Sequence, residues 1–198
     1  MATPDEKLVR RLVSEALERA LGPAPGAPST APAPPSPARP VSPKRVALGA
    51  DHGGYALKEI LRRAIADEMG WDVHDCGTHS AEAVDYPDFA AAVAREVASG
   101  RAALGIVVDT AGIGSTMAAN KVAGVRCALC HDDATVLNAR EHNDANVLSL
   151  AGRFTPHDEL ARIVRAWFAA RFDSGRHARR VEKIREIEND ELAHRATH

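Results

Sequence analysis

The chain lacks the features that would place it in a membrane or on a nucleic acid. Its 198 residues contain no run of 18 apolar residues, and the first 22 alternate charge with hydrophobicity instead of forming the apolar centre of a signal peptide. No block of Lys and Arg interleaves with aromatic residues, and the formal net charge is -2. We therefore expect a cytoplasmic globular protein that binds neither a membrane nor a nucleic acid.

Cysteine is scarce, which leaves little material for disulfides or a structural metal site. Of the three cysteines, Cys127 and Cys130 form a C-x-x-C pair, but no second pair at zinc-finger spacing follows. Both lie in a strand-like segment, so we interpret them as reduced core or near-surface residues, and a metal site is the less favoured interpretation. The sequence predicts no metal site.

Proline is concentrated in one stretch. Residues 23–43 hold nine of the twelve prolines, mixed with Ala, Ser and Gly, and contain no periodic apolar residues. Such a composition cannot bury a core and is typical of an extended spacer. We therefore divide the chain into an N-terminal segment (residues 1–22), a Pro/Ala-rich linker (residues 23–43) and a folded domain (residues 44–198).

The N-terminal segment is predicted to form an amphipathic helix. Thr3 is placed to cap it, Pro4 occupies its first position, Glu6 completes a capping box, and Gly22 ends it. Its apolar stripe must be covered, either by the chain's own domain, by self-association, or by another protein. A short amphipathic helix on a Pro/Ala-rich linker resembles the encapsulation peptides that draw enzymes into bacterial microcompartments, which implies a shell protein as partner.

From residue 44 onward, apolar strand-like runs alternate with helical patterns. Strands are predicted over residues 45–50, 71–75, 103–108, 125–130 and 147–150, and helices over residues 54–68, 87–99, 114–121, 134–143 and 156–172. Five strand–helix units predict an α/β fold with a five-stranded parallel sheet between two layers of helices. A charged helix over residues 176–193 has no strand left to cover, so we expect its apolar residues to pack on a second subunit.

Polar residues gather where the predicted strands end. Asp51 and His52 follow the first strand, Asp109 ends the third before a loop of small residues, and Arg153 follows the fifth. Because the carboxyl ends of parallel strands meet at one rim, we expect these three segments to converge there. Taken singly, each has an ordinary explanation, since Asp-Gly and Asn-Asp pairs often only cap helices and shape turns.

Five short segments stand out along the folded domain: ALGADHGGYALKE, DYPDFA, GIGSTMAANKVAGVR, REHNDANVL and SGRHARRV. In their order and spacing they resemble the type B ribose-5-phosphate isomerase family, which includes the galactose-6-phosphate isomerase subunits. The resemblance covers residues 45 to about 188. It implies a Rossmann-like three-layer sandwich, a homodimer or tetramer with sites at the subunit interface, and aldose–ketose isomerisation of a sugar phosphate without metal or other cofactor.

The resemblance also implies roles for residues that contact the sugar. His142 is similar to the group that opens the sugar ring, and Asp51 and Tyr86 are similar to residues that help to hold the substrate. The site for the enediolate oxygen is implied at three positions: Asn143 and the amides around Gly112 and Gly114. Glycine amides at a helix start favour developing negative charge.

A second set of residues resembles the family's phosphate site. Its members are His52, Arg153, Arg176 and Arg180, the last two expected to reach across the dimer interface. Guanidinium groups suit a phosphate because they donate two parallel hydrogen bonds to it.

The loop after the third strand departs from the family pattern. Many members have cysteine at the position of Asp109 and threonine at the position of Ala111, and another branch has glutamate at the position of Ser115. Because proton transfer between two sugar carbons needs a base, we predict that Asp109 is the base and that Thr110 or Ser115 replaces the missing hydroxyl. The alternative is that Asp109 only caps the amides of the next helix, which would make it a poor base.

Together these patterns predict an aldose–ketose isomerase that acts on ribose 5-phosphate or a related C4–C6 sugar phosphate and is packaged in a microcompartment. The alternative is a catalytically silent sugar-phosphate-binding or assembly module that kept the phosphate site and lost the usual base. Retention of the ring-opening histidine, His142, argues against the silent module.

Overall fold

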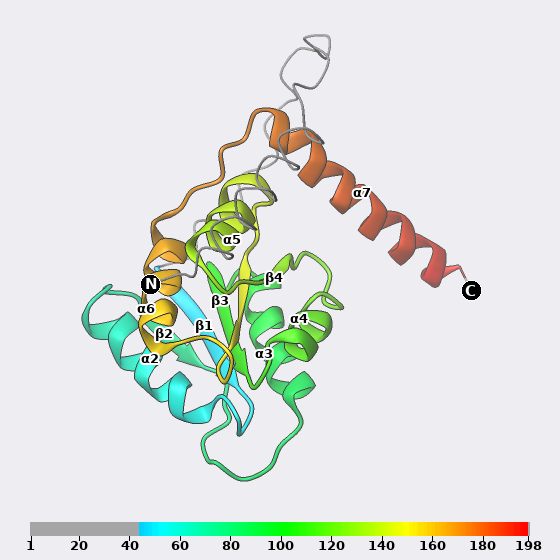
Figure 1. Cartoon of the computed structure of the whole chain (residues 1–198). Coiled ribbons are helices and arrows are strands. Elements are labelled where there is room, and N and C mark those ends of the chain that lie inside the picture. Colours follow the sequence, from blue (N-terminus) through cyan, green and yellow to red (C-terminus); the bar gives the residue numbers. More distant parts are fainter. Residues whose placement is uncertain (1–43, 198) are drawn as a thin grey trace, which may run out of the picture. The chain divides into compact units, whose positions relative to one another are not determined.

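The structure is a computed structural model that describes residues 44–197 (Figure 1). The predicted N-terminal helix and the Pro/Ala-rich linker lie outside the described residues. Within residues 44–197, no helix combines the length and the hydrophobicity needed to cross a membrane.

Five strands form one parallel sheet, as the sequence predicts. They are β1 (Arg45–Ala50), β2 (Asp72–Asp75), β3 (Leu104–Asp109), β4 (Cys127–Leu129) and β5 (Val147–Ala151), in the spatial order β2-β1-β3-β5-β4. All residues of β3 and β5 are buried, because helices cover the sheet on both faces. Since β3 lies between β1 and β5, the loops that follow these three strands are neighbours.

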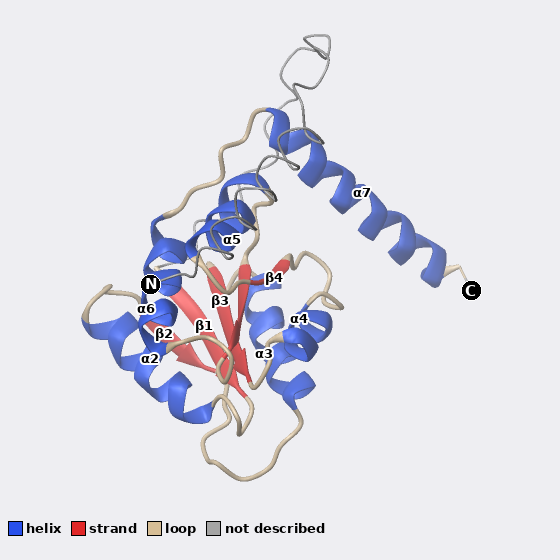
Figure 2. Ribbon diagram, viewed as in Figure 1, coloured by secondary structure: helices blue, strands red, loops and turns tan. Residues whose placement is uncertain are grey.

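The helices make up the two outer layers (Figure 2). One core joins the sheet to α2 (Tyr55–Asp67), α5 (Asp133–Leu137) and α6 (His157–Ala169). The other joins the opposite face to α3 (Tyr86–Ala98) and α4 (Ile113–Ala119). Helix α5 continues into a π-helical turn, η1 (Asn138–His142), and the last helix is α7 (Arg176–Ala196). The predicted three-layer α/β sandwich is confirmed.

Two glycines in the central strands let α3 approach the sheet closely. A Cβ atom at Gly49 would lie 2.8 Å from Val93 Cγ2, and one at Gly105 would lie 2.7 Å from Val93 Cγ1. Real Cβ contacts are not this short, so a larger residue at either position would push α3 outward. The close packing of α3 sets the position of Tyr86, its first residue, at the rim of the sheet.

Candidate active site

The loops that follow β1, β3 and β5 meet at one rim of the sheet. The Asp51 amide donates to Val108 O at 3.3 Å, the Gly152 amide to Asp109 O at 2.8 Å, and the Arg153 amide to Thr110 O at 3.2 Å. The backbone thereby joins the three segments directly. Their predicted convergence is confirmed.

The carboxylate of Asp109 is occupied by donors from its own loop. Oδ1 accepts hydrogen bonds from the amides of Ala111, at 2.8 Å, and of Gly112. Oδ2 accepts from the Ser115 amide at 3.1 Å and from the Ser115 hydroxyl at 2.5 Å. Only 5% of Asp109 is exposed. This arrangement favours the anchoring role over the predicted role as base, because all four lone-pair positions of the carboxylate are directed at donors of its own loop.

The two hydroxyls predicted to assist proton transfer differ in their surroundings. Ser115 is fully buried, and its hydroxyl donates to Asp109. Thr110 is half-buried, and its Oγ1 would lie 2.4 Å from a Cβ atom at Gly53, next to Asp51. Thr110 is therefore the better placed of the two hydroxyls to meet a ligand at the rim.

Asp51 is the second carboxylate at this rim and is less constrained. Its Oδ1 accepts a hydrogen bond from the Gly54 amide at 2.9 Å, and among the described residues no hydrogen bond to its Oδ2 is seen. The neighbouring His52 is exposed, and its Nδ1 lies 3.2 Å from both the amide and the carbonyl of Val84, so it contacts the loop that leads to α3. Asp51, which is only 7% exposed, and the exposed His52 lie side by side at the carboxyl end of β1.

Tyr86 and Gly114 depend on each other for space. A Cβ atom at Gly114 would lie 2.5 Å from Cζ of the Tyr86 ring and 2.7 Å from its hydroxyl oxygen. The ring of Tyr86, a residue that is 40% exposed, thus lies directly over the start of α4. Tyr86 therefore lies beside the loop that follows β3.

Lys58 supports this rim, although the sequence reading did not single it out. Its side chain is fully buried, and Nζ donates to both oxygens of Asp75 at 2.7 and 2.6 Å. Asp75 also accepts from the Gly77 amide at 2.9 Å. Burial alone raises the pKa of Asp75, but the Lys58 and Gly77 hydrogen bonds together hold it below its usual value. The sequence feature that could have identified Lys58 is its position on the apolar face of α2, because a buried lysine is rarely left without a charged partner.

A second cluster forms where η1 ends and α7 begins. The rings of His142 and His177 stack with centroids 4.1 Å apart and planes inclined by 2°. Asn143 Nδ2 donates to Asn138 Oδ1 at 3.0 Å, which turns the Asn138 amide nitrogen toward His142 Nδ1, 2.9 Å away. Because that nitrogen donates, Nδ1 accepts, and the proton of neutral His142 is assigned to Nε2.

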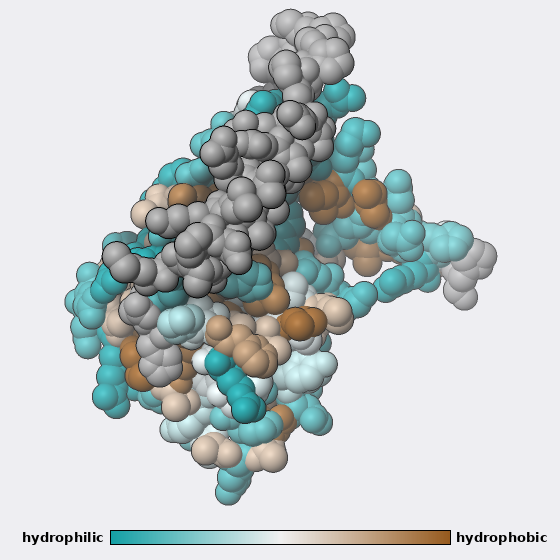
Figure 3. All heavy atoms as spheres, in the orientation of Figure 1, coloured by the Kyte–Doolittle hydropathy of each residue, from teal (hydrophilic) through white to brown (hydrophobic). Residues whose placement is uncertain are grey.

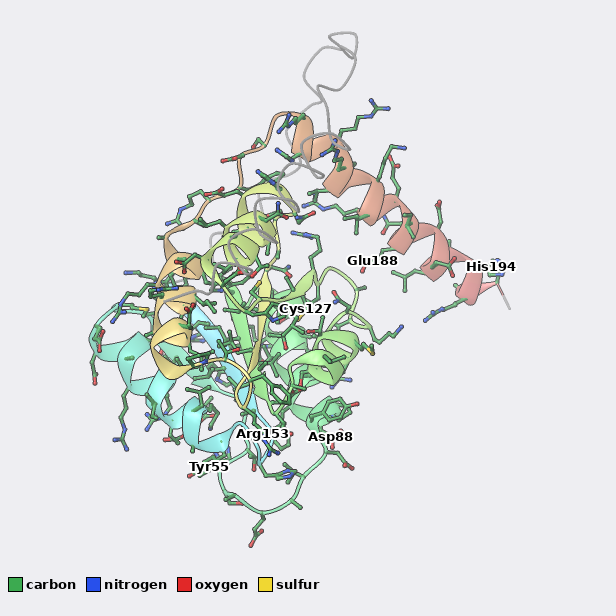
Figure 4. The ribbon with its side chains drawn as sticks, viewed as in Figure 1. Tyr55, Asp88, Cys127, Arg153, Glu188 and His194 are labelled. Carbon is green, nitrogen blue, oxygen red and sulfur yellow. The ribbon has the colours of Figure 1, made fainter. Side chains whose placement is uncertain are left out.

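The rim and this second cluster lie at opposite ends of the sheet. His142 precedes β5, whereas Asp109 ends β3. Gly105 pairs with Val147 at one end of the two strands and Asp109 with Ala151 at the other, four residue steps, or about 13 Å, apart. In Figure 4, Arg153 lies at the opposite side of the domain from the start of α7. A single chain therefore does not bring His142, Asn143, Arg176 and Arg180 to the rim.

An open groove lies between α7 and the edge strand β4. Its volume is about 980 Å³, and its lining includes Cys127, Leu129, Ile184, Ile187 and Leu192. The last three are exposed on α7, by 45, 63 and 47%, and hydrophobic residues appear along α7 in Figure 3. At one point the groove is bridged by Glu188, which accepts a hydrogen bond from the Gly124 amide at 2.9 Å.

Two residue groups contain the side-chain types that bind metal ions. Burial raises the pKa of Cys127 to about 12 and that of Cys130 to about 11, the opposite of what a thiolate site requires. Within the described part of the chain, one trio has ligand atoms all within 4.8 Å of one another: Glu141, His142 and Asp173. This trio includes the histidine for which the resemblance implies ring opening.

Comparisons with known proteins are consistent with this architecture. The family model described as Ribose/Galactose Isomerase matches residues 46–184. The chain is 42% identical over 146 residues to ribose-5-phosphate isomerase B of Escherichia coli (strain K12), which covers 73% of this chain and 97% of that protein. The structure of Clostridium thermocellum ribose-5-phosphate isomerase B is similar, with 46% identity, a TM-score of 0.71 and coverage of 74% of this chain and 98% of that one. The Mycoplasma genitalium enzyme with bound ribulose-5-phosphate shows 39% identity, a TM-score of 0.70 and coverage of 73% and 96%.

Proposed function

Because the chain belongs to the ribose/galactose isomerase family, we propose that it interconverts an aldose phosphate and a ketose phosphate through an enediolate. Ribose 5-phosphate and ribulose 5-phosphate are the first substrates to test, followed by related C4–C6 sugar phosphates. The observation that supports this most directly is the match to relatives of nearly full length, combined with a rim that carries Asp51, Tyr86 and Arg153. Incubation of the full chain with a panel of these sugar phosphates tests it. Binding without conversion would instead support the silent module.

Asp51 is the better candidate for the base. Asp109 accepts four hydrogen bonds from its loop, whereas Asp51 keeps Oδ2 without a partner among the described residues. A base needs a free lone pair within reach of the substrate proton. We assign Asp109 to holding the loop in place. That Asp109 is the base stays a prediction, and the geometry of the loop disfavours it.

Thr110 and Gly114 complete the proposed site. The Thr110 hydroxyl lies beside Asp51 and suits proton movement between the two substrate oxygens. The Gly112 amide donates to Asp109, so of the two predicted oxyanion amides we assign Gly114 to the enediolate oxygen. Ser115, whose hydroxyl is bound to Asp109, is assigned to the loop anchor.

A complete site requires two copies of the chain. Each copy supplies the rim with Asp51 and Arg153 for one site, and His142, Asn143 and the arginines of α7 for the other. The separation of the two clusters along β3 and β5 supports this, as does the apolar groove beside α7, which suits a second copy.

Complementation tests the shared site. Asp51→Asn and His142→Asn should each be inactive as homodimers. Mixed dimers made by co-expression carry one intact site out of two, and random pairing predicts about a quarter of the wild-type activity. Recovery of no activity from isolated mixed dimers would argue that all site residues come from one chain.

Residues 1–22 lie outside both the family match and the described residues. Their amphipathic pattern supports the proposal that they bind a microcompartment shell protein. Fusion of residues 1–43 to a fluorescent protein should produce co-purification with shells. Diffuse fluorescence in cells that assemble shells would contradict the proposal.

A further inference from the structure

His177 lies in a contact that the proposed function does not explain. Its ring stacks on His142, with centroids 4.1 Å apart. Only 7% of His177 is exposed, whereas Arg176 and Arg180 on either side are exposed. The Asp173 amide donates to Glu141 O at 3.0 Å beside this contact, so the chain before α7 is also attached to the end of η1. The first turn of α7 is therefore fixed to the histidine assigned to ring opening.

The second contact of His177 reaches the phosphate-binding group. Arg176 Nε lies 3.3 Å from His177 Nε2. A guanidinium nitrogen only donates, so Nε2 is the acceptor and the His177 proton is assigned to Nδ1. Burial lowers the pKa of His177, and His142, Arg176 and Arg180 lower it further, against an opposing effect of Asp173. The hydrogen bond from Arg176 requires an unprotonated Nε2, and the lowered pKa of His177 favours that form.

The two stacked rings have different charged neighbours. Arg176 and Arg180 lie near His177, on the same helix. His142 faces the carboxylates of Glu141 and Asp173, whose ligand atoms lie within 4.8 Å of its own. Its Nδ1 accepts from Asn138, so its Nε2 is the nitrogen free to donate a proton to the ring oxygen of a sugar.

We propose that His177 is a positioning residue. Its ring fixes the plane of the His142 ring, and its Nε2 accepts a hydrogen bond from the Arg176 guanidinium. His177 therefore fixes the acid for ring opening and the phosphate-binding arginine relative to each other. The inference rests on the proposed function, which assigns His142 and Arg176 to the same substrate. A pocket that fixes both groups presents the ring oxygen of a bound sugar phosphate at a set distance from its phosphate.

Two substitutions separate the two contacts. His177→Phe keeps an aromatic ring against His142 and removes the acceptor for Arg176, whereas His177→Ala removes both. The matched control is His74→Ala on β2, a histidine whose side chain is 48% exposed. Steady-state isomerisation of ribose 5-phosphate, calorimetric binding of inorganic phosphate, and thermal unfolding are measured for all four full-length proteins.

For His177→Phe we expect KM and the phosphate Kd to rise about tenfold, the size of one charge-assisted hydrogen bond, with kcat within about twofold of wild type. For His177→Ala we expect the same rise and, in addition, a loss of kcat of about tenfold or more. The control should match wild type. Equal kcat in the Phe and Ala variants, or unchanged phosphate affinity in both, would overturn the proposal.

Nitrogen NMR of the His142 ring separates this inference from the proposed function. In wild type and His177→Phe we expect one Nε2-protonated tautomer, and in His177→Ala a broadened or mixed population. If the wild-type protein converts no sugar phosphate, the isomerase proposal fails, while phosphate binding and these spectra still test the coupling. A wild-type His142 spectrum in His177→Ala would refute the coupling whatever the activity.

Discussion

Replacing Asp109 by asparagine tests whether this carboxylate anchors its loop, as the hydrogen bonds indicate, or acts as the base. The substitution keeps the size of the side chain and one oxygen, but turns the other oxygen into a donor. In the structure that donor would face either the amides of Ala111 and Gly112 or the amide and hydroxyl of Ser115. The Ser115 hydroxyl can rotate to accept, but an amide cannot, so at least one buried amide loses its partner.

The cost follows from the hydrogen bonds lost. Each buried donor left without a partner costs about 1–3 kcal/mol, and the site is only 5% exposed, so we expect about 3 kcal/mol of lost stability. For a chain of this size, that lowers the Tm by about 10 °C. Turnover should fall less than it would on loss of a general base, whose contribution is about 10²–10⁴-fold.

Asp51→Asn is the matched control, because it makes the same chemical change at the end of the neighbouring strand. Asp51 accepts one observed hydrogen bond, from Gly54, so its Tm should change by no more than about 3 °C, while kcat should fall at least about 100-fold. Thermal unfolding and initial rates with ribose 5-phosphate measure both variants. If Asp109→Asn keeps its Tm and loses turnover, Asp109 is the base and the assignment made here is wrong.

Three further predictions concern buried titratable groups. Lys58→Met removes the charged partner of Asp75, whose side chain is 22% exposed, and should lower the free energy of unfolding by about 2–3 kcal/mol in denaturant titrations. An unchanged free energy of unfolding would show that the Lys58–Asp75 pair contributes nothing to stability. Iodoacetamide at pH 8 should leave activity and intact mass unchanged, because pKa values raised to about 11–12 leave about 0.1% thiolate or less. Rapid labelling would contradict the raised pKa values of Cys76, Cys127 and Cys130. The free energy of unfolding should fall as the pH drops below about 6.5, because His177 of the unfolded chain binds a proton there, whereas folded His177 has a lowered pKa and does not. The free energy of unfolding of His177→Phe should depend less on pH. Identical pH dependence in the two proteins would exclude His177 as a cause of the acid destabilisation.

The site could be predicted from sequence only in part. Asp51, Asp109 and Arg153 are predicted to lie at one rim because a parallel sheet gathers the carboxyl ends of its strands there, whereas Tyr86 is implied only by the family resemblance. For Asp109 the sequence predicts a base, with a helix cap as the alternative, since both functions favour a carboxylate at a strand end. The direction of the Ala111, Gly112 and Ser115 amides, set by the fold of the loop, favours the cap, and no sequence pattern encodes that direction.

The sequence by itself determined the order of strands and helices, the three-layer fold and the family, because apolar periodicity and short motifs are local properties of the chain. Tertiary structure alone decided that His142 lies away from Asp51 in the same chain and that it stacks on His177. It also decided that Lys58 is buried against Asp75. These are relations between residues on different elements, and they follow from how the elements pack, which no local pattern encodes.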